Sequence, residues 1–162
     1  FRDAELLMRL SGYKHDNFTY SDLLVNENYP KTKNLYNYIL DNYDNIYIIG
    51  NHRAKKTPLA KKYNFIPIGD NFFNFYDQHL FKIIKEIKKV PSGSIILMSA
   101  SSLSNILGYN IWKKRKDLTL IDVGSSINHL LDFEGNRVYQ EGISLFDKII
   151  SLKFLFNNKM KL

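Results

Sequence analysis

The chain has 162 residues, of which 44% are hydrophobic and 24% charged, a composition typical of one globular domain with a sizeable buried core. It contains no cysteine, so disulfides and thiolate metal sites are excluded. No apolar run approaches the roughly 20 residues that a membrane-spanning helix needs. We expect residues 1–162 to form a single domain, and the start at Phe1 instead of Met fits a domain excised from a longer protein.

The formal net charge is +7, and a basic surface of this kind attracts anions. The lysines gather in four clusters, which begin at Lys55, Lys61, Lys88 and Lys113. These clusters fall at the ends of expected helices, where positive charge complements the helix dipole, and they are not interleaved with aromatic residues. We therefore expect no nucleic acid partner. A general attraction for phosphate-bearing ligands or for an anionic membrane surface is the better interpretation.

In chain order, the first expected element is a helix over residues 3–10, followed by a long polar and aromatic loop over 13–29. Pro30 then suits the first turn of a helix that runs to about Tyr43. Its expected buried face consists of Leu35, Tyr38, Ile39 and Tyr43.

The middle of the chain alternates strands and helices. The β-branched run 45–50 and the shorter run 65–68 predict buried strands, with a short helix inside 51–62 between them. A helix is expected within 72–89. The residues at helical spacing on its buried face are Phe73, Tyr76, Leu80, Ile83, Ile84 and Ile87.

The clearest unit follows, with a strand over 94–98, a small-residue turn over 99–102, a helix over 103–112 and a strand over 118–122. Such strand–helix–strand alternation predicts an α/β fold, in which helices flank a mostly parallel sheet. The last expected elements are a loop over 132–142 and a helix over 143–156.

The turn after the strand 94–98 is a candidate ligand site. In an open α/β sheet, ligands bind beyond the carboxyl ends of the strands, and helix N-termini favour phosphate. The hydroxyl and backbone N–H groups of Ser99, Ser101 and Ser102 suit a phosphate or a ribose. The structural alternative is a helix N-cap, and we expect one of these serines to cap the helix that follows.

A second candidate lies after the strand 118–122. The carboxylate of Asp122 is followed by Gly124, Ser125 and Ser126, and this group suits a ribose, a sugar hydroxyl or a metal-bound water. The alternative is that Asp122 caps the next helix through the serine-rich turn.

Other chemistry-bearing residues give weaker signals. Asp3 and Glu5 offer oxygen ligands of the kind that Mg²⁺ takes, although acidic residues also favour a first helical turn. Among the four histidines, which lack metal-ligand spacing, His129 is the best candidate because it follows the Asp122 loop. No nucleophile elbow, Walker loop or Gly-x-Gly-x-x-Gly motif is present, which argues against a hydrolase triad, a P-loop enzyme and ordinary NAD binding.

The order of these motifs resembles the GT-D type glycosyltransferases, which are bacterial enzymes with a Rossmann-like three-layer fold. The stretches that carry the resemblance are Phe1-Arg2-Asp3-Ala4-Glu5-Leu6, Phe65-Ile66-Pro67, Asn71-Phe72-Phe73, Leu97-Met98-Ser99-Ala100-Ser101-Ser102-Leu103 and Ile121-Asp122-Val123-Gly124-Ser125-Ser126. The chain departs from the family in lacking the glycines beside Asp3. It also has Ser125 where some relatives carry a histidine, which leaves that base role unassigned.

The resemblance implies transfer of a sugar from a nucleotide sugar, most simply a UDP-sugar, to a hydroxyl of a glycan or glycoprotein in the bacterial cytoplasm or at the inner face of the membrane. It implies that Asp3 and Glu5 hold Mn²⁺ or Mg²⁺ against the donor diphosphate, with Glu5 also part of the catalytic centre. Asp122 would act either as the general base or as a ligand of the donor sugar. The residues implied to contact the nucleotide are Asn71, Ser99, Ser101, Ser102, Gly124, Ser125 and Ser126.

Two other functions remain open from the sequence. A non-catalytic Rossmann-like module would bind a nucleotide or a glycan without turnover, and it needs no carboxylate pair. A nucleic-acid-binding function is suggested only by the net charge of +7. It predicts binding of DNA or RNA that weakens steeply as the salt concentration rises.

Overall fold

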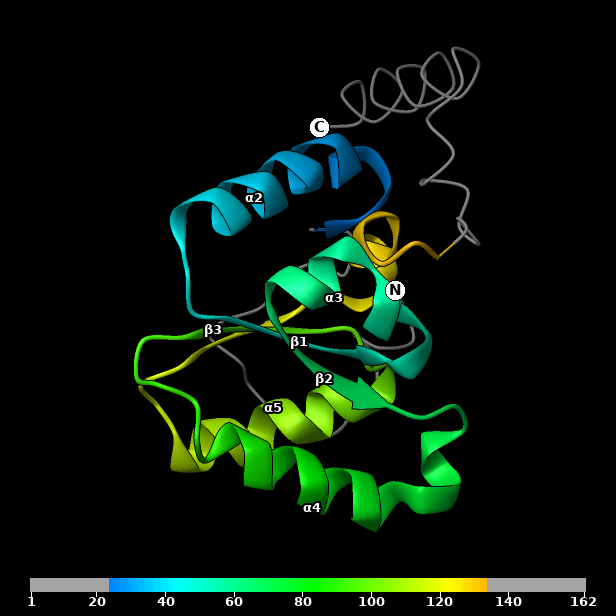
Figure 1. Cartoon of the computed structure of the whole chain (residues 1–162), viewed down its shortest axis with the longest axis vertical. Coiled ribbons are helices and arrows are strands. Elements are labelled where there is room, and N and C mark those ends of the chain that lie inside the picture. Colours follow the sequence, from blue (N-terminus) through cyan, green and yellow to red (C-terminus); the bar gives the residue numbers. More distant parts are fainter. Residues whose placement is uncertain (1–23, 134–162) are drawn as a thin grey trace, which may run out of the picture.

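The structure, a computed structural model, describes residues 24–133, which contain one parallel four-stranded sheet (Figure 1). Its strands lie in the order β2-β1-β3-β4, and every neighbouring pair is parallel. Their bounds are β1 Ile46–Asn51, β2 Asn64–Ile68, β3 Ile95–Met98 and β4 Thr119–Asp122. Each of these strands lies within two residues of a run that the sequence predicts as a strand.

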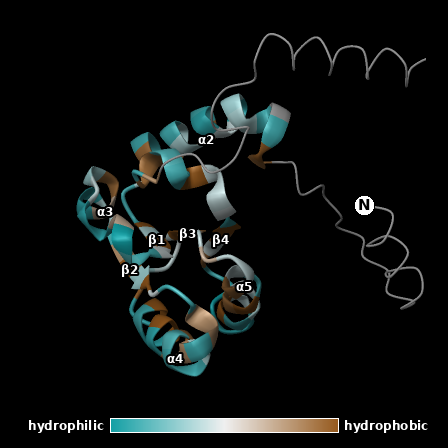
Figure 2. Cartoon of the chain, turned by 90° about the vertical axis from the view of Figure 1, so that its right-hand side faces the viewer, coloured by the Kyte–Doolittle hydropathy of each residue, from teal (hydrophilic) through white to brown (hydrophobic). Residues whose placement is uncertain are grey.

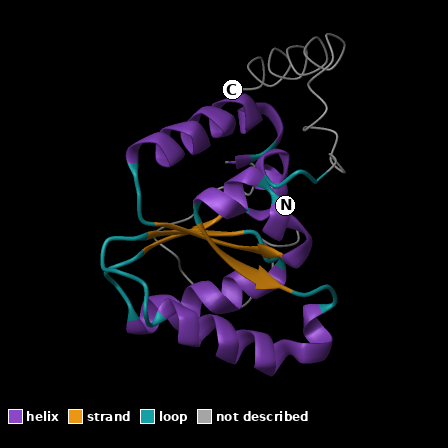
Figure 3. Ribbon diagram, viewed as in Figure 1, coloured by secondary structure: helices purple, strands orange, loops and turns teal. Residues whose placement is uncertain are grey.

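Helices cover both faces of the sheet (Figures 2 and 3). The α-helices are α2 Tyr29–Asn42, α3 Pro58–Lys62, α4 Tyr76–Ile87 and α5 Ser102–Lys114. Short 3-10 helices lie between them, namely η2 Asn26–Asn28, η3 His52–Lys56, η4 Phe72–Phe75 and η5 Gly124–Leu130. Helices α2 and α3 lie on one face and α4 and α5 on the other, which confirms the Rossmann-like three-layer α/β fold.

The core has two halves, one on each face of the sheet. Alternate side chains of β3 point to opposite faces, so Ile96 and Met98 pack with α4 and α5, whereas Ile95 and Leu97 pack with α2 and η5. All four residues of this strand are buried, because it has a neighbouring strand on each edge and helices on each face.

The buried face of α2 differs from the expected one. The helix has Pro30 in its first turn and buries Ile39 as expected, but the exposed fractions of Leu35 and Tyr38 are 41% and 58%. Tyr43, another expected core residue, is also exposed. Tyr36 is fully buried instead, because its hydroxyl finds a hydrogen-bond partner inside the protein.

A second correction concerns the start of α4. Residues 72–75 form the separate 3-10 helix η4, which buries Phe72 and leaves Phe73 67% exposed. The remaining expected face is confirmed, since Ile83 and Ile87 are buried.

Several expected elements lie outside the described residues. These are the helix over 3–10, most of the loop over 13–29, the loop after residue 133 and the helix over 143–156. Within residues 24–133, no helix combines the length and the apolar character needed to cross a membrane.

Candidate functional site

The strand order places a topological switch point at the edge where the strands end, which we call the carboxyl edge, and we call the position beyond the ends of β1 and β3 the crevice. From β1 the chain passes to β2 on one side and then returns through α4 to β3 on the other side of β1. The connection after β1 packs on the α2 face, whereas α5, which follows β3, packs on the opposite face. The two connections therefore diverge between the ends of β1 and β3, which is where open α/β sheets bind their ligands.

Ser99 ties the strand ends at the carboxyl edge together. Its backbone N–H donates to the Ile49 carbonyl of β1 at 2.8 Å, and its Oγ donates to the Gly124 carbonyl at 2.8 Å. The Val123 N–H also donates to the Met98 carbonyl, at 2.9 Å. The hydroxyl of Ser99 thus positions the loop after β4 relative to the loop after β3.

The first turn of α5 carries two exposed serines, Ser101 and Ser102. Ser101 is the N-cap residue, but it makes no side-chain capping bond, so the expected serine cap is wrong. The hydroxyl of Ser104, one turn into the helix, instead accepts a hydrogen bond from the Ala100 N–H at 3.2 Å. Ser101 has φ 51° and ψ −141°, a backbone conformation that favours glycine.

This arrangement leaves the positive end of the α5 dipole exposed at the crevice. The helix has 13 residues, its last turn carries Lys113 and Lys114, and its first turn has no acidic residue. Backbone N–H groups at such an end attract phosphate.

Asp122 ends β4 and is exposed at the carboxyl edge. Its Oδ1 accepts a hydrogen bond from the Gly124 N–H at 3.2 Å, and this bond closes a local turn at the start of η5. The bond agrees with a structural role for Asp122, but the N-cap residue of η5 is Val123 and not Asp122. Asp122 is in register with Met98 and lines a groove beside α5 together with Ser104 and Asn105. Its carboxylate therefore borders both the carboxyl edge and the flank of the sheet.

The two serines after Gly124 lie deeper than Asp122. Ser126 is fully buried, and its Oγ donates to the Val123 carbonyl while the Tyr36 hydroxyl bonds to the same Oγ. A ligand at the surface does not reach this hydroxyl, so Ser126 supports the packing of α2 against η5. Ser125 is half-buried, and Gly124 has φ +48° with open space around its Cα.

The carboxyl edge also holds a polar cluster that the sequence reasoning missed. Asn51 donates through Nδ2 to Asp70 Oδ1 at 2.8 Å, and Arg53 donates through a guanidinium nitrogen to Asp70 Oδ2 at 2.7 Å. The hydrogen bond from Asn51, followed by that from Arg53, lowers the pKa of Asp70. Asn51 ends β1 and Asp70 comes two residues after β2, so both residues could have been identified from their positions at the ends of predicted strands.

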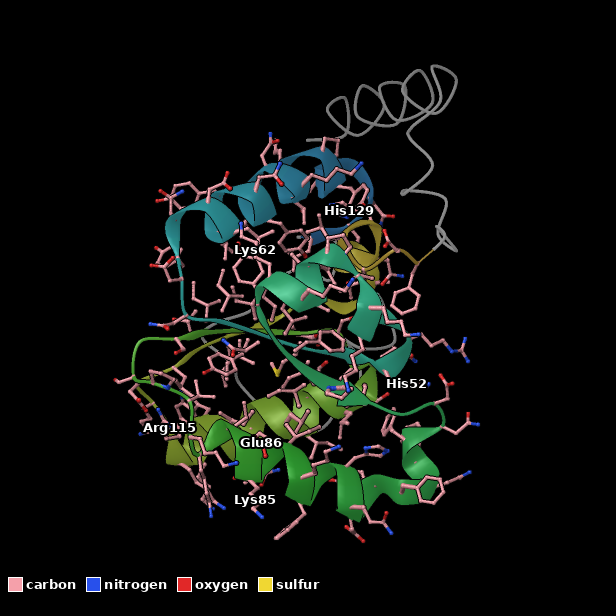
Figure 4. All side chains as sticks on the ribbon, in the orientation of Figure 1. His52, Lys62, Lys85, Glu86, Arg115 and His129 are labelled. Carbon is pink, nitrogen blue, oxygen red and sulfur yellow. The ribbon has the colours of Figure 1, made fainter. Side chains whose placement is uncertain are left out.

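Two further candidates, Asn71 and His129, have local environments that are explained by their roles in the fold. Asn71, next to Asp70, is exposed with φ 51°, a left-handed conformation that asparagine tolerates well. Nδ1 of His129 lies 2.9 Å from the Tyr29 hydroxyl and 3.2 Å from the Ser126 carbonyl oxygen, on the α2 side of the sheet (Figure 4). Partial burial of its ring lowers the pKa of His129, and the Ser126 carbonyl opposes this by raising it.

A metal site does not assemble from residues 24–133 alone. No group of three or more histidine, aspartate or glutamate side chains in this range is arranged to hold a metal ion. The carboxylates of Asp122 and Asp70 come from strands at opposite sides of the sheet, and Asp70 is already paired with Arg53. Asp3 and Glu5, the expected ligands, lie outside the described residues.

Comparisons of the chain with protein-family models, with curated proteins and with solved structures found no match. Its function is therefore inferred from the geometry and chemistry of the carboxyl edge.

Proposed function

We propose that the chain is a glycosyltransferase that uses a nucleotide sugar, with the donor diphosphate held at the crevice between the ends of β1 and β3. The observation that carries the proposal is the N-terminus of α5, where the N-cap side chain makes no capping bond and Ser101 and Ser102 are exposed at the topological switch point. Backbone N–H groups, hydroxyls and the helix dipole all favour a diphosphate there.

The cluster after β1 supports the same assignment. The Arg53 side chain is 66% exposed at this edge, and Asp70 holds its guanidinium on one side. A fixed guanidinium with free donors is well suited to a phosphate oxygen. The ordinary dinucleotide fingerprint is absent, so the phosphate contacts come from serines and an arginine in place of a glycine-rich turn.

In the transfer, the bond between the sugar C1 and the diphosphate oxygen breaks, and the acceptor oxygen forms the new bond to C1. Asp122 either takes the proton of the acceptor hydroxyl or binds a hydroxyl of the donor sugar. The proposal retains Mn²⁺ or Mg²⁺ on Asp3 and Glu5, where the cation would neutralise charge on the leaving diphosphate.

The test measures release of UDP from a panel of UDP-sugars by the full chain, with Mn²⁺ present and then with a chelator. We expect chelation to reduce turnover, and we expect Asp122→Asn to reduce it by about 100-fold if the carboxylate is the base. Asp41→Asn, which changes an exposed carboxylate on α2, is the matched control and leaves turnover unchanged.

Full turnover in Asp122→Asn removes that residue from the chemistry. Saturable UDP binding without release from any donor replaces the enzyme with a non-catalytic nucleotide-binding module. Turnover that survives both chelation and the pair Asp3→Ala and Glu5→Ala overturns the metal assignment.

A further inference from the structure

A groove of about 380 Å³ runs along the flank of the sheet between α5 and β4, which lie side by side in Figure 2. It is shallow and open to solvent, with a volume at the lower end of the range of small-molecule sites. We call it the α5 groove, and the lining residues that matter are Asn105, Gly108, Tyr109 and Trp112 from α5, with Leu120 and Asp122 from β4. Among these residues, only Asp122 stands at a strand end of the kind that predicts a ligand site.

Two aromatic rings stand exposed in the α5 groove. Tyr109 and Trp112 are three residues apart on α5, so they lie on the same side of the helix, and their exposed fractions are 62% and 55%. Lys116 Nζ lies 4.9 Å from the centroid of the Trp112 ring, so a ligand that stacks on this indole must use its other face. Exposed aromatic rings of this kind offer flat apolar surfaces next to polar groups.

The polar groups of the α5 groove select the kind of ligand. Asp122 supplies a carboxylate and Asn105 an amide, both at the end of the groove nearest the carboxyl edge. Within residues 24–133 no lysine or arginine lines the groove, and Lys116, the cation beside it, lies over the Trp112 ring. A carboxylate and an amide beside aromatic rings match a neutral ring that has hydroxyl donors on its rim and C–H groups on its faces.

Gly108 provides an independent observation. Glycine is among the poorest helix formers, yet it stands in the interior of α5. A Cβ built on Gly108 meets only Met98 Cε, at 3.7 Å, which is an ordinary van der Waals contact. Packing therefore does not require glycine at this position, whereas a side chain here would occupy part of the groove that Gly108 lines.

We propose that the α5 groove binds a saccharide, and that this saccharide is the acceptor. The sugar ring stacks on Trp112 and Tyr109 over Gly108, and its hydroxyls bond to Asn105 and Asp122. The assignment as acceptor rests on the proposed glycosyltransferase function, because it places the acceptor hydroxyl at Asp122 while the donor diphosphate occupies the crevice between β1 and β3. Saccharide binding itself does not depend on turnover.

Trp112 makes the proposal directly measurable, because it is the only tryptophan in the chain. The full chain is titrated with maltotriose, cellotriose and chitotriose, and the indole fluorescence is followed. We expect at least one trisaccharide to give a saturable shift with a dissociation constant on the order of 1 mM or lower. A proline-rich peptide serves as the competing kind of ligand and gives no saturable shift.

Three variants locate the binding. Asp122→Asn loses a charge-assisted hydrogen bond and weakens binding by about tenfold. Gly108→Ala weakens it by roughly threefold while raising the melting temperature, because alanine favours the helix but obstructs the ligand. Phe81→Ala removes a 74% exposed aromatic ring from α4 and leaves the affinity unchanged.

The outcomes separate this inference from the proposed function. Release of UDP from a UDP-sugar, with no fluorescence response to any trisaccharide, overturns the groove and leaves the glycosyltransferase proposal standing. Saccharide binding that Asp122→Asn and Gly108→Ala weaken, in a chain that neither binds nor turns over UDP-sugars, supports the groove and overturns the transfer. An equal response to the peptide, or unchanged affinity in both groove variants, overturns the saccharide site.

Discussion

The two edges of the sheet use their polar groups in opposite ways. At the edge where the strands begin, which we call the amino edge, Arg115 donates to the carbonyls of Ile87 and Val90 at 3.1 and 2.8 Å and to both carboxylate oxygens of Asp117. At the carboxyl edge, by contrast, Ser101 and Asp122 are exposed. Figure 4 shows Arg115 and His52 at these opposite edges. The arginine of the amino edge joins the layers, whereas the carboxyl edge, besides the bonds made by Ser99 and Asp70, leaves Ser101 and Asp122 open to solvent.

The electrostatics of the amino edge agree with a structural role. The hydrogen bonds from Arg115 hold the pKa of Asp117 far below its ordinary value, and the same pairing raises the pKa of Arg115. The Gly93 N–H also donates to the Asp117 carbonyl, at 2.9 Å. One arginine thus joins the end of α5, the end of α4 and the turn before β3.

The largest effect is expected from removing the Arg115 guanidinium, which tests the contrast between the two edges. Arg115→Met leaves the carbonyls of Ile87 and Val90 without their donor, so we expect the melting temperature to fall by several degrees while UDP binding by the folded chain is unchanged. Thermal unfolding and nucleotide titration measure the two effects. Lys82→Met, which removes an exposed cation from α4, changes neither. Loss of UDP binding at an unchanged melting temperature would contradict the division between the edges.

A smaller effect of opposite sign is expected at the carboxyl edge. Ser101→Gly relieves the unfavourable backbone at φ 51°, and we expect the free energy of unfolding to rise by about 1 kcal/mol. The same change weakens UDP binding, because the Ser101 hydroxyl is lost. Denaturant unfolding tests the gain, with Ser102→Gly as the control that destabilises the first turn of α5. A lower free energy of unfolding in Ser101→Gly would show that the backbone of Ser101 is not strained.

The smallest effect concerns His129, on the α2 side of the carboxyl edge. Because burial lowers its pKa below the ordinary 6.5, the unfolded chain binds more protons below that pH. The contribution of the neutral ring to stability is therefore complete above about pH 6.5 and is lost as the pH falls through the folded-state pKa.

Denaturant unfolding at about pH 7.5 and about pH 5.5 checks this dependence. His129→Gln flattens the difference between the two pH values, whereas Gln78→Ala, which changes an exposed uncharged residue of α4, preserves it. If the free energy of unfolding changes by the same amount between the two pH values in the native chain and in His129→Gln, the Tyr29–His129 contact does not titrate in this range.

The central strands could be predicted because strands buried on both faces read as continuous apolar runs. Ile46–Asn51 and Ile95–Met98 have this property, and their positions follow from it. The buried face of α2 could not be predicted in the same way. Tyrosines occupy both sides of that helix, and a hydrogen bond from Tyr36 to Ser126, across 90 residues of sequence, selects the buried one.

The candidate site was predicted in part. The strand-end rule places Ser99 to Ser102 and Asp122 correctly at the carboxyl edge, because parallel strands end on the same side. It does not distinguish exposed from buried hydroxyls, so the predicted ligand contacts also contain Ser126, which is buried. The α5 groove could not be predicted, because it forms between Trp112 and Leu120 across the turn that joins α5 to β4.

The position of β1 in the sheet also has a consequence for folding kinetics. Its pairing with β2 joins Tyr47 to Asn64, a separation of 17 residues, whereas its pairing with β3 joins Ile46 to Ile95, a separation of 49 residues. The shorter loop has the lower closure entropy, so we expect the β1–α3–β2 unit to form early and then to template the arrival of β3. The crevice needs the longer closure and is therefore completed late, whereas the α5 groove lies within β3–α5–β4, where Ile95 pairs with Thr119 at a separation of 24 residues.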